Sequence, residues 1–75
     1  MNKQRRKAIT EIVSKLEEIM ADLNTLQEEE QEAFDNLPEG LQDSEKGEAM
    51  ETAAGLLEEA VNSVGDAIDG LGGIE

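Results

Sequence analysis

The sequence predicts an all-α protein, an antiparallel two-helix hairpin that packs like a coiled coil. Three observations lead to this fold class. The 75 residues contain a single proline and a single aromatic residue, Phe34, with no cysteine. Apolar residues recur in alternating steps of three and four on both sides of the proline. The two apolar rows also match each other in one antiparallel register, so a folded hairpin is favoured over one long rod.

The first helix is expected from about residue 3 to about residue 36. Its composition of Glu, Lys, Leu, Ala and Gln favours helix throughout. The spacing of its apolar residues places one narrow row along the helix: Ile9, Ile12, Leu16, Ile19, Leu23 and Leu26. Glu30 interrupts this row, and Ala33 and Leu37 resume it. We therefore assign these residues to the seam that faces the second helix.

A turn is expected over residues 37–43, followed by a second helix over about 44–70. Pro38 disfavours helical geometry at the residue before it, and Gly40 can supply a left-handed turn. Asp43 or Ser44 is the candidate N-cap of the second helix. Its apolar row again alternates four and three: Met50, Ala54, Leu57, Val61, Val64, Ile68 and Leu71. The glycines of segment 71–75 indicate a frayed C-terminus.

The two rows match when the chain reverses within the turn. Facing residues then have numbers that sum to 80, from Leu26 with Ala54 to Ile9 with Leu71, and six pairs fit this one register. A turn of this length is normal between two antiparallel helices. The whole chain is thus expected to form a single hairpin domain.

Apolar residues beside the seam offer a means of self-association. We expect three of them on one flank of the first helix and three alanines on the opposite flank of the second. These candidate self-association residues are Val13, Met20, Phe34, Ala53, Ala60 and Ala67. Two hairpins could pair through such stripes into a four-helix bundle, as a homodimer. The alternative is that the stripes are only partly buried margins of the seam.

The charge is divided unevenly along the chain. Nineteen acidic residues against six basic ones give a net charge of −13. Residues 1–15 hold five basic residues and one acidic residue, net +4, whereas residues 16–75 hold 18 acidic residues against Lys46, net −17. In a hairpin, Asp66, Asp69 and Glu75 come back toward the basic N-terminus. We expect them to neutralise it, which disfavours direct binding of nucleic acid.

Composition excludes most catalytic sites. Without cysteine or histidine the chain has no thiol nucleophile, no imidazole base and no zinc site of the usual ligands, so we expect neither an enzyme nor a cofactor. The acidic residues near position 30 point in different directions on a helix, which predicts no metal site. Apolar runs of three residues or fewer exclude a membrane span and a signal peptide, which indicates a cytoplasmic protein.

The acidic body has a charge density close to that of duplex DNA. Residues 16–64 carry a net charge of −14 over a hairpin length of about 32 Å. That is about one charge per 2.3 Å, against roughly one per 1.7 Å of B-DNA. The candidate partner-binding residues are Glu28, Glu29, Glu32, Asp35, Glu39, Asp43, Glu45 and Glu48. Phe34, Leu37 and Leu41 at the same end either plug the seam or form a recognition tip.

Several short motifs resemble small acidic proteins encoded by phages and prophages of Gram-positive bacteria. They are the basic start at 1–7 (MNKQRRK), EQE at 30–32, NLPE at 36–39, LQ at 41–42 and SE at 44–45. The C-terminal half departs from the pattern because it is poorer in acidic residues and richer in glycine. The resemblance implies a helical hairpin that binds and disables a host factor in the host cytoplasm, and it supplies no catalytic residue.

Two functions remain open. The first is a nucleic-acid mimic that inhibits a host nucleic-acid-handling or defence protein by occupying its basic groove. Its partner would be a basic host protein, with no direct contact to nucleic acid or to a membrane, because both repel a chain of this charge. The second is a structural or assembly hairpin that acts through self-association.

Overall fold

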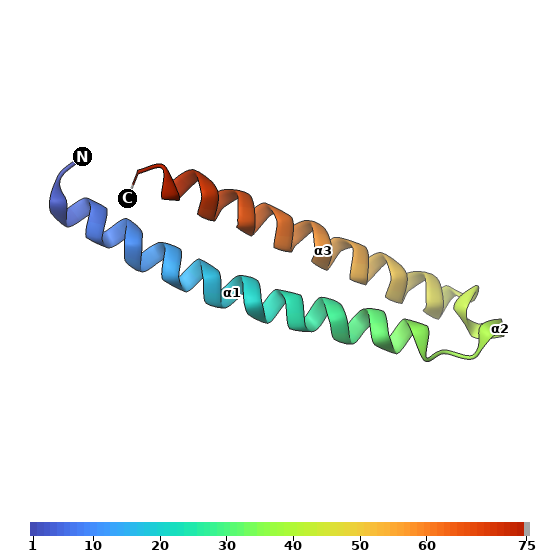
Figure 1. The fold of residues 1–75 in the computed structure, drawn as a ribbon. Helices are drawn as coiled ribbons and strands as arrows, with labels where there is room; N and C mark the ends of the chain where they lie inside the picture. Colours follow the sequence, from blue (N-terminus) through green and yellow to red (C-terminus); the bar gives the residue numbers. More distant parts are fainter. Residues whose placement is uncertain (75) are drawn as a thin grey trace.

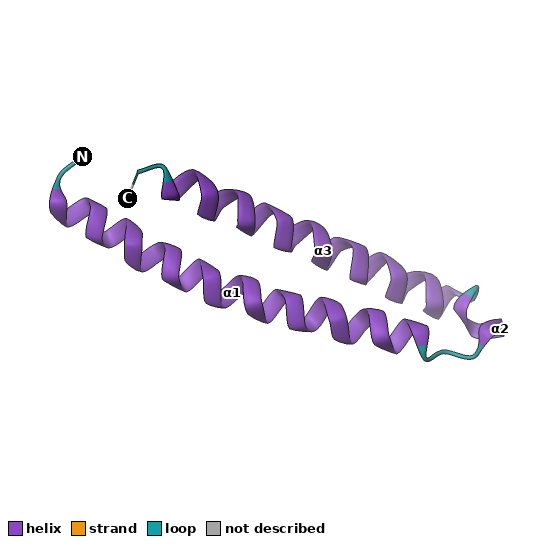
Figure 2. Cartoon of the chain, in the orientation of Figure 1, coloured by secondary structure: helices purple, strands orange, loops and turns teal. Residues whose placement is uncertain are grey.

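The computed structural model describes residues 1–74, which form the helices α1 (Lys3–Asp35), α2 (Glu39–Gln42) and α3 (Glu45–Gly72). The long helices α1 and α3 lie side by side, with the short α2 in the connection between them (Figure 1). The N-terminus and the end of α3 lie together at the other end of the molecule. Loop residues are confined to the two ends (Figure 2). The prediction of an all-helical chain is confirmed, in the form of an extended pair of long helices.

The helix pair is a thin rod with little core. Its Cα atoms span 58 × 14 × 12 Å with a radius of gyration of 17.1 Å, against about 11 Å for a compact chain of this length. Its accessible surface of 5497 Å² exceeds the roughly 4500 Å² typical of a compact monomer of this mass. Val13 and Ala54 are the only buried apolar residues of the described chain. None of the helices within residues 1–74 has the length and apolar character needed to cross a membrane.

Side chains and backbone groups define the ends of α1. Asn2 caps its start, where the side-chain Oδ1 accepts a hydrogen bond from the backbone N–H of Arg5 at 2.8 Å. At the other end Asn36 donates its backbone N–H to the carbonyl of Glu32 at 3.0 Å. Pro38 follows two residues later, which explains why the helix does not continue through Leu37.

The turn contains a helix where a left-handed glycine was expected. The carbonyl of Pro38 accepts hydrogen bonds from the backbone N–H groups of Leu41 at 2.8 Å and Gln42 at 3.3 Å, and these bonds build α2. Gly40 lies inside α2, and no described glycine has a positive φ. The expectation of a left-handed Gly40 was wrong because a right-handed helical turn reverses the chain here.

Helix α3 begins at a serine cap and ends later than expected. Ser44, rather than Asp43, is the N-cap, and its Oγ accepts a hydrogen bond from the backbone N–H of Gly47 at 3.3 Å. The helix continues to Gly72 instead of ending near residue 70, and the backbone N–H of Ile74 still bonds to the carbonyl of Leu71 at 2.9 Å. Of the segment expected to fray, Glu75 lies outside the described residues.

The row of α1 that faces α3 is not the one expected. Ile12, Ile19 and Leu26, assigned to the seam, are 46%, 47% and 50% exposed. The residues of α1 and its C-terminal extension that are buried or half-buried form a different row, in steps of four and three: Ile9, Val13, Leu16, Met20, Leu23, Gln27, Glu30, Phe34 and Leu37. Val13, Met20 and Phe34 therefore belong to the contact with α3, and their expected place on an outer flank was wrong.

Both rows share Ile9, Leu16 and Leu23, so the spacing alone does not distinguish them. The observed row buries Phe34 where the expected row would bury the much smaller Ala33, and a larger buried side chain removes more apolar surface from water. Met20 also finds room beside Gly65, where a Cβ atom would lie 3.7 Å from its Sδ. In α3 the observed row includes all seven expected residues from Met50 to Leu71.

The side chain of Gln42 attaches the turn to the end of α1, and Gly47 allows the turn to pack closely against α3. The Nε2 of Gln42 donates to the carbonyls of Phe34 at 3.4 Å and of Leu37 at 3.3 Å, and the Phe34 carbonyl also accepts the backbone N–H of Leu37 at 3.1 Å. Gly47 is buried in the first turn of α3, and a Cβ atom there would collide with the backbone of Leu41 and Gln42. The close approach of α2 to α3 therefore requires glycine at position 47.

A pair of glycine substitutions tests this packing. We expect Gly47→Ala to destabilise the protein by roughly 1–3 kcal/mol because the added methyl group overpacks the turn. The matched change Gly55→Ala, in open space within the same helix, should stabilise it by roughly 0.5–1 kcal/mol. Urea unfolding followed by circular dichroism measures both. Equal effects of the two substitutions would contradict the packing of the turn described above.

Candidate functional site

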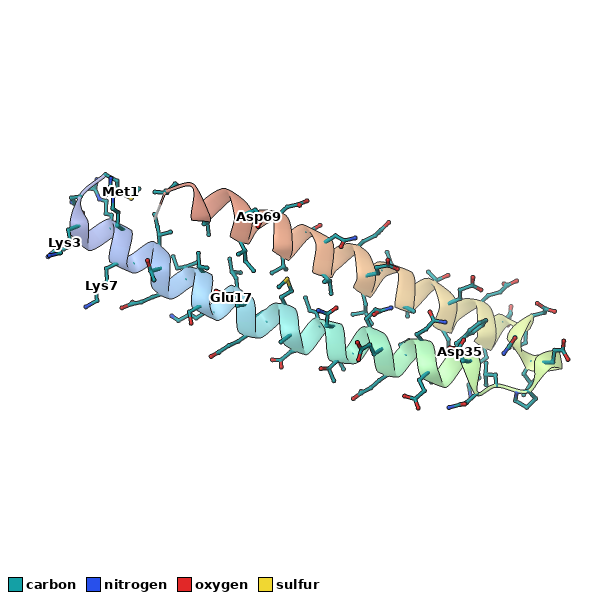
Figure 3. The ribbon with its side chains drawn as sticks, in the orientation of Figure 1. Met1, Lys3, Lys7, Glu17, Asp35 and Asp69 are labelled. Atoms are coloured by element: carbon teal, nitrogen blue, oxygen red, sulfur yellow. The ribbon has the colours of Figure 1, made fainter. Side chains whose placement is uncertain are left out.

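The candidate partner-binding residues gather at the end of the rod that contains the turn. We call this end the acidic tip, defined by Glu28, Glu29, Glu32, Asp35, Glu39, Asp43, Glu45 and Glu48. Four of these lie near the end of α1, one lies on α2, one follows α2, and two lie in the first turn of α3. The chain reversal thus brings carboxylates from both long helices to one end, where Figure 3 labels Asp35.

All eight carboxylates of the acidic tip are exposed to solvent. Glu28, Glu32 and Asp35 follow each other in steps of four and three, so they share one side of α1. Gln31 donates a hydrogen bond from Nε2 to the Oδ1 of Asp35 at 3.1 Å. Glu30 differs from its neighbours because it is half-buried in the row that faces α3. Within residues 1–74, no group of three acidic side chains could hold a metal ion.

The acidic tip opposes the dipole of α1. The C-terminal end of a helix carries a partial negative charge that favours cations, yet the last turn of α1 contains Glu32 and Asp35 and no basic residue. The first turn of α1 likewise contains basic residues and no acidic one, although it carries a partial positive charge. In α3, by contrast, Glu45 and Glu48 complement the dipole. The charges at the two ends of α1 therefore do not stabilise this helix through its dipole.

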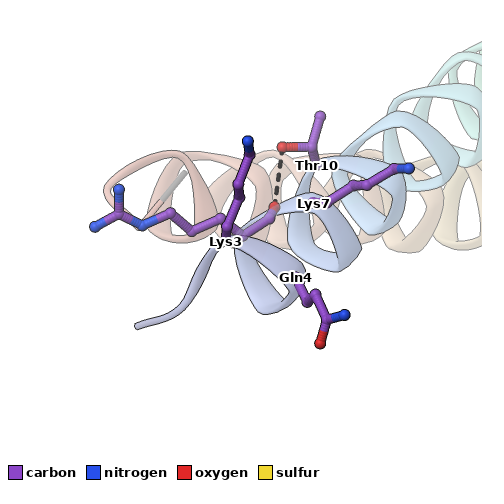
Figure 4. A pocket seen from close by; sticks show the side chains of 5 residues that line it. Lys3, Gln4, Lys7 and Thr10 are labelled. Carbon is purple, nitrogen blue, oxygen red and sulfur yellow. Dashed lines mark hydrogen bonds between the residues drawn. The ribbon is translucent and has the colours of Figure 1, made fainter.

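Five of the six basic residues lie within residues 1–15, toward the opposite end of the rod, whereas Lys46 lies in the first turn of α3. Lys3 and Lys7 point away from α3, and Asp69 projects from the far side of α3 (Figure 3), so these three side chains do not meet. A depression of about 490 Å³ lies against Lys3, Gln4, Arg6, Lys7 and Thr10. All five residues are exposed on one helix, and their side chains spread in different directions (Figure 4). Thr10 only donates its hydroxyl to the carbonyl of Arg6, at 3.1 Å. The depression is therefore open surface and does not enclose a ligand.

The three large apolar residues at the tip divide between the two roles considered for them. Phe34 and Leu37 are half-buried and cover the end of the seam. Leu41 on α2 is 49% exposed and points its apolar surface to solvent among the carboxylates. Leu41 is the one apolar side chain at the acidic tip with substantial surface free for a partner.

A second apolar surface runs along the side of the rod. Ile12, Ile19 and Leu26 of α1 are about half exposed, and they repeat every seven residues. On α3, Ala53 and Ala60 are half-buried and Ala67 is exposed. The apolar spacing predicted that the alanines lie beside the seam between the helices, and that the three large α1 residues lie within it. The signal that separates the two α1 rows is the position of Phe34, which belongs to the buried row.

Opposite effects of two charge substitutions test the role of the helix dipoles. We expect Glu32→Gln to raise the unfolding free energy by roughly 0.3–1 kcal/mol, because it removes a negative charge from the negative end of α1. Glu45→Gln should lower it by a similar amount, because it removes a favourable charge from the start of α3. Unfolding at low ionic strength measures both. Changes of the same sign would contradict the dipole account.

Comparison with known proteins assigns no function to this chain. No family model, no curated protein and no solved structure matches this chain. The resemblance to small acidic phage proteins stays a prediction from short motifs. The physical basis for a function is therefore the acidic tip and the apolar side of the rod.

Proposed function

We propose that this protein is a non-enzymatic binding protein that inhibits a nucleic-acid-handling or defence protein by occupying its basic groove. The observation that carries the proposal is the acidic tip, where eight exposed carboxylates from both long helices meet at one end of a narrow rod. A phage-encoded protein of this kind would act in the host cytoplasm. Its partner would be a basic protein, while nucleic acids and membranes would be repelled by its net charge of −13.

The dimensions of the rod support mimicry of a nucleic acid. Two helices with their side chains measure about 20 Å across, since each is about 10–12 Å wide. Residues 16–64 carry a net charge of −14, at a linear density comparable with that of B-DNA. Among the described residues every carboxylate except the half-buried Glu30 is exposed, so nearly all of this charge faces solvent. A groove shaped for a duplex could accommodate such a rod.

The unfavourable placement of charge on α1 supports the same proposal. Acidic residues near the negative end of a helix cost roughly 0.3–1 kcal/mol each when exposed at low ionic strength. Glu32 and Asp35 carry this cost without a basic residue in the last turn. A partner with a positive surface would convert the cost into attraction and would accelerate association through electrostatic steering.

A second candidate function is supported by the exposed apolar residues. In it the chain is a coiled-coil-like antiparallel hairpin that acts as an assembly protein, and two hairpins pair into a four-helix bundle. Ile12, Ile19 and Leu26 favour this candidate because a regular apolar row lies uncovered on α1. The thin core favours it too, because small helical folds are commonly stabilised by association.

Two variants of equal charge separate binding at the tip from a general charge effect. The tip variant converts Glu32, Asp35, Glu45 and Glu48 to their amides. The matched control converts Glu17, Glu18, Glu58 and Glu59 to glutamine in the middle of the rod. Each protein is immobilised and exposed to a bacterial lysate at low and at high salt, and bound proteins are then challenged with duplex DNA.

We expect the unmodified protein to retain basic nucleic-acid-binding proteins at low salt and to release them at high salt or on addition of DNA. The tip variant should lose far more of this retention than the mid-rod control. If no basic nucleic-acid-binding protein is retained at low salt, the proposed inhibition of such a protein is wrong. Equal losses in both variants would show that the tip has no special role.

A further inference from the structure

The exposed apolar residues of α1 and the small residues of α3 lie on the same side of the helix pair. In the buried row of α1 the steps between residues alternate between four and three. Ile12 and Ile19 each come immediately before a row member that follows a step of four, namely Val13 and Met20. Ala53 and Ala60 hold the same position relative to the buried row of α3. Two antiparallel helices are related by a two-fold axis perpendicular to the plane that contains them. Rotation about this axis exchanges the two helices but leaves each side of the plane where it is. Residues at equivalent positions of the two helices therefore lie on the same side of the pair. This arrangement differs from the expected one, in which the apolar flank of the first helix and the alanine flank of the second lie on opposite sides.

On this side, which we call the apolar face, α3 carries a second row with helical spacing. Its residues alternate in steps of four and three and carry no charge: Ala49, Ala53, Leu56, Ala60, Ser63, Ala67, Gly70 and Ile74. Leu56 within it is 60% exposed. The equivalent positions on the opposite side of the pair hold polar residues or glycine: Thr10, Glu17, Asn24 and Gln31 of α1, with Glu51, Glu58, Gly65 and Gly72 of α3. Only one side of the rod is therefore suited to further helix packing.

The distribution of charge indicates what covers the apolar face. Residues 1–15, at the open end, have a net charge of +4. Residues 28–48, around the turn, contain nine acidic residues and one lysine, net −8. If two copies lie face to face with their turns at opposite ends, each basic end lies over an acidic end. If the turns lie at the same end, the two acidic ends repel each other.

We propose that two copies of this chain pair through their apolar faces, antiparallel to each other, into a four-helix bundle. In this arrangement α1 packs on α1 of the second copy and α3 packs on its α3, related by a two-fold axis near Ile19 and Ala60. These residues are the centres of the rows Ile12–Ile19–Leu26 and Ala53–Ala60–Ala67. By the rise of a helix they lie about 24 Å from the end of α1 and about 22 Å from the start of α3, so both are at the same level of the rod.

The size of the face is sufficient for a stable dimer. A side of the rod measuring 58 by 14 Å between Cα atoms has a projected area of about 800 Å². Each partner in a standard protein interface buries roughly the same area. The alanines and glycine of the α3 row permit close approach of two helices, and the larger residues of the α1 row supply most of the apolar surface. Pairing would also provide the core that one copy lacks, since Val13 and Ala54 are the only buried apolar residues within residues 1–74.

This inference builds on the self-association candidate and is independent of any basic partner. Its first test is the molar mass of the purified protein, measured by light scattering during gel filtration over a wide range of concentration. We expect a discrete dimer. Ile19→Glu and Leu56→Glu, which place charges on the apolar face from either helix, should each weaken dimerisation by about ten-fold or more. Asn24→Glu adds the same charge on the polar side of α1 and should leave the dimer unchanged.

A monomer at every concentration would overturn the proposal and would leave the binding of a basic partner untouched. An equal effect of Asn24→Glu and Ile19→Glu would overturn the choice of face. Circular dichroism of each variant separates loss of dimer from loss of helix. Leu56 provides a second position whose side chain is mostly exposed, so the test does not depend on Ile19 alone.

The orientation is tested by distances between spin labels, because the chain has no cysteine of its own. A label at Gly40→Cys marks the tip, and one at Asn62→Cys marks the middle of the rod. In the antiparallel dimer, the two tip labels should be at least about 48 Å apart, twice the distance from Ile19 to the end of α1. The two mid-rod labels should be much closer. A tip-to-tip distance of about 20–25 Å, two helix diameters, would show the same-end dimer and would overturn the proposed orientation.

Discussion

The contact of one α1 row with α3 determines which apolar residues of this protein are buried and which are exposed. That row includes Val13, Met20 and Phe34, and it is the only substantial core that the described chain possesses. Because α1 carries two overlapping apolar rows, burying one leaves the other exposed. Ile12, Ile19 and Leu26 lie at the surface for this reason, on the same side as the uncharged row of α3. The choice of row thus gives a simple helix pair one apolar side and one polar side.

Much of the fold follows from local signals in the sequence. Pro38 and the caps at Asn2 and Ser44 define the helix ends within a few residues, because capping and proline sterics act over one turn. The α3 row is unambiguous because only one set of its residues combines large side chains with helical spacing. The α1 row is ambiguous, since Ile9, Leu16 and Leu23 belong to both candidates. The decision depends on how Phe34 packs at the far end of the helix, which is a tertiary effect that periodicity does not contain.

The candidate site could be predicted in part for similar reasons. Charge is a property of composition, so the acidic tip follows from the sequence once the chain reverses near Pro38. Contacts between the charges are less predictable. Lys3 and Lys7 point away from α3, and neutralisation of the basic end by Asp69 is not a direct pairing of these side chains. The rod therefore keeps a basic end and an acidic end, and this polarity is what both a basic partner and a second copy would recognise.

The relative burial of neighbouring residues in α1 tests the central claim most directly. Single cysteines at positions 12 and 13 occupy adjacent sites, one exposed and one facing α3. At protein concentrations low enough for the chain to be monomeric, a thiol reagent should modify Ile12→Cys at least about ten-fold faster than Val13→Cys. Modification at position 13 is slower because it requires the two helices to separate. Faster modification at position 13 would mean that Ile12 faces α3, and the apolar face would then not exist.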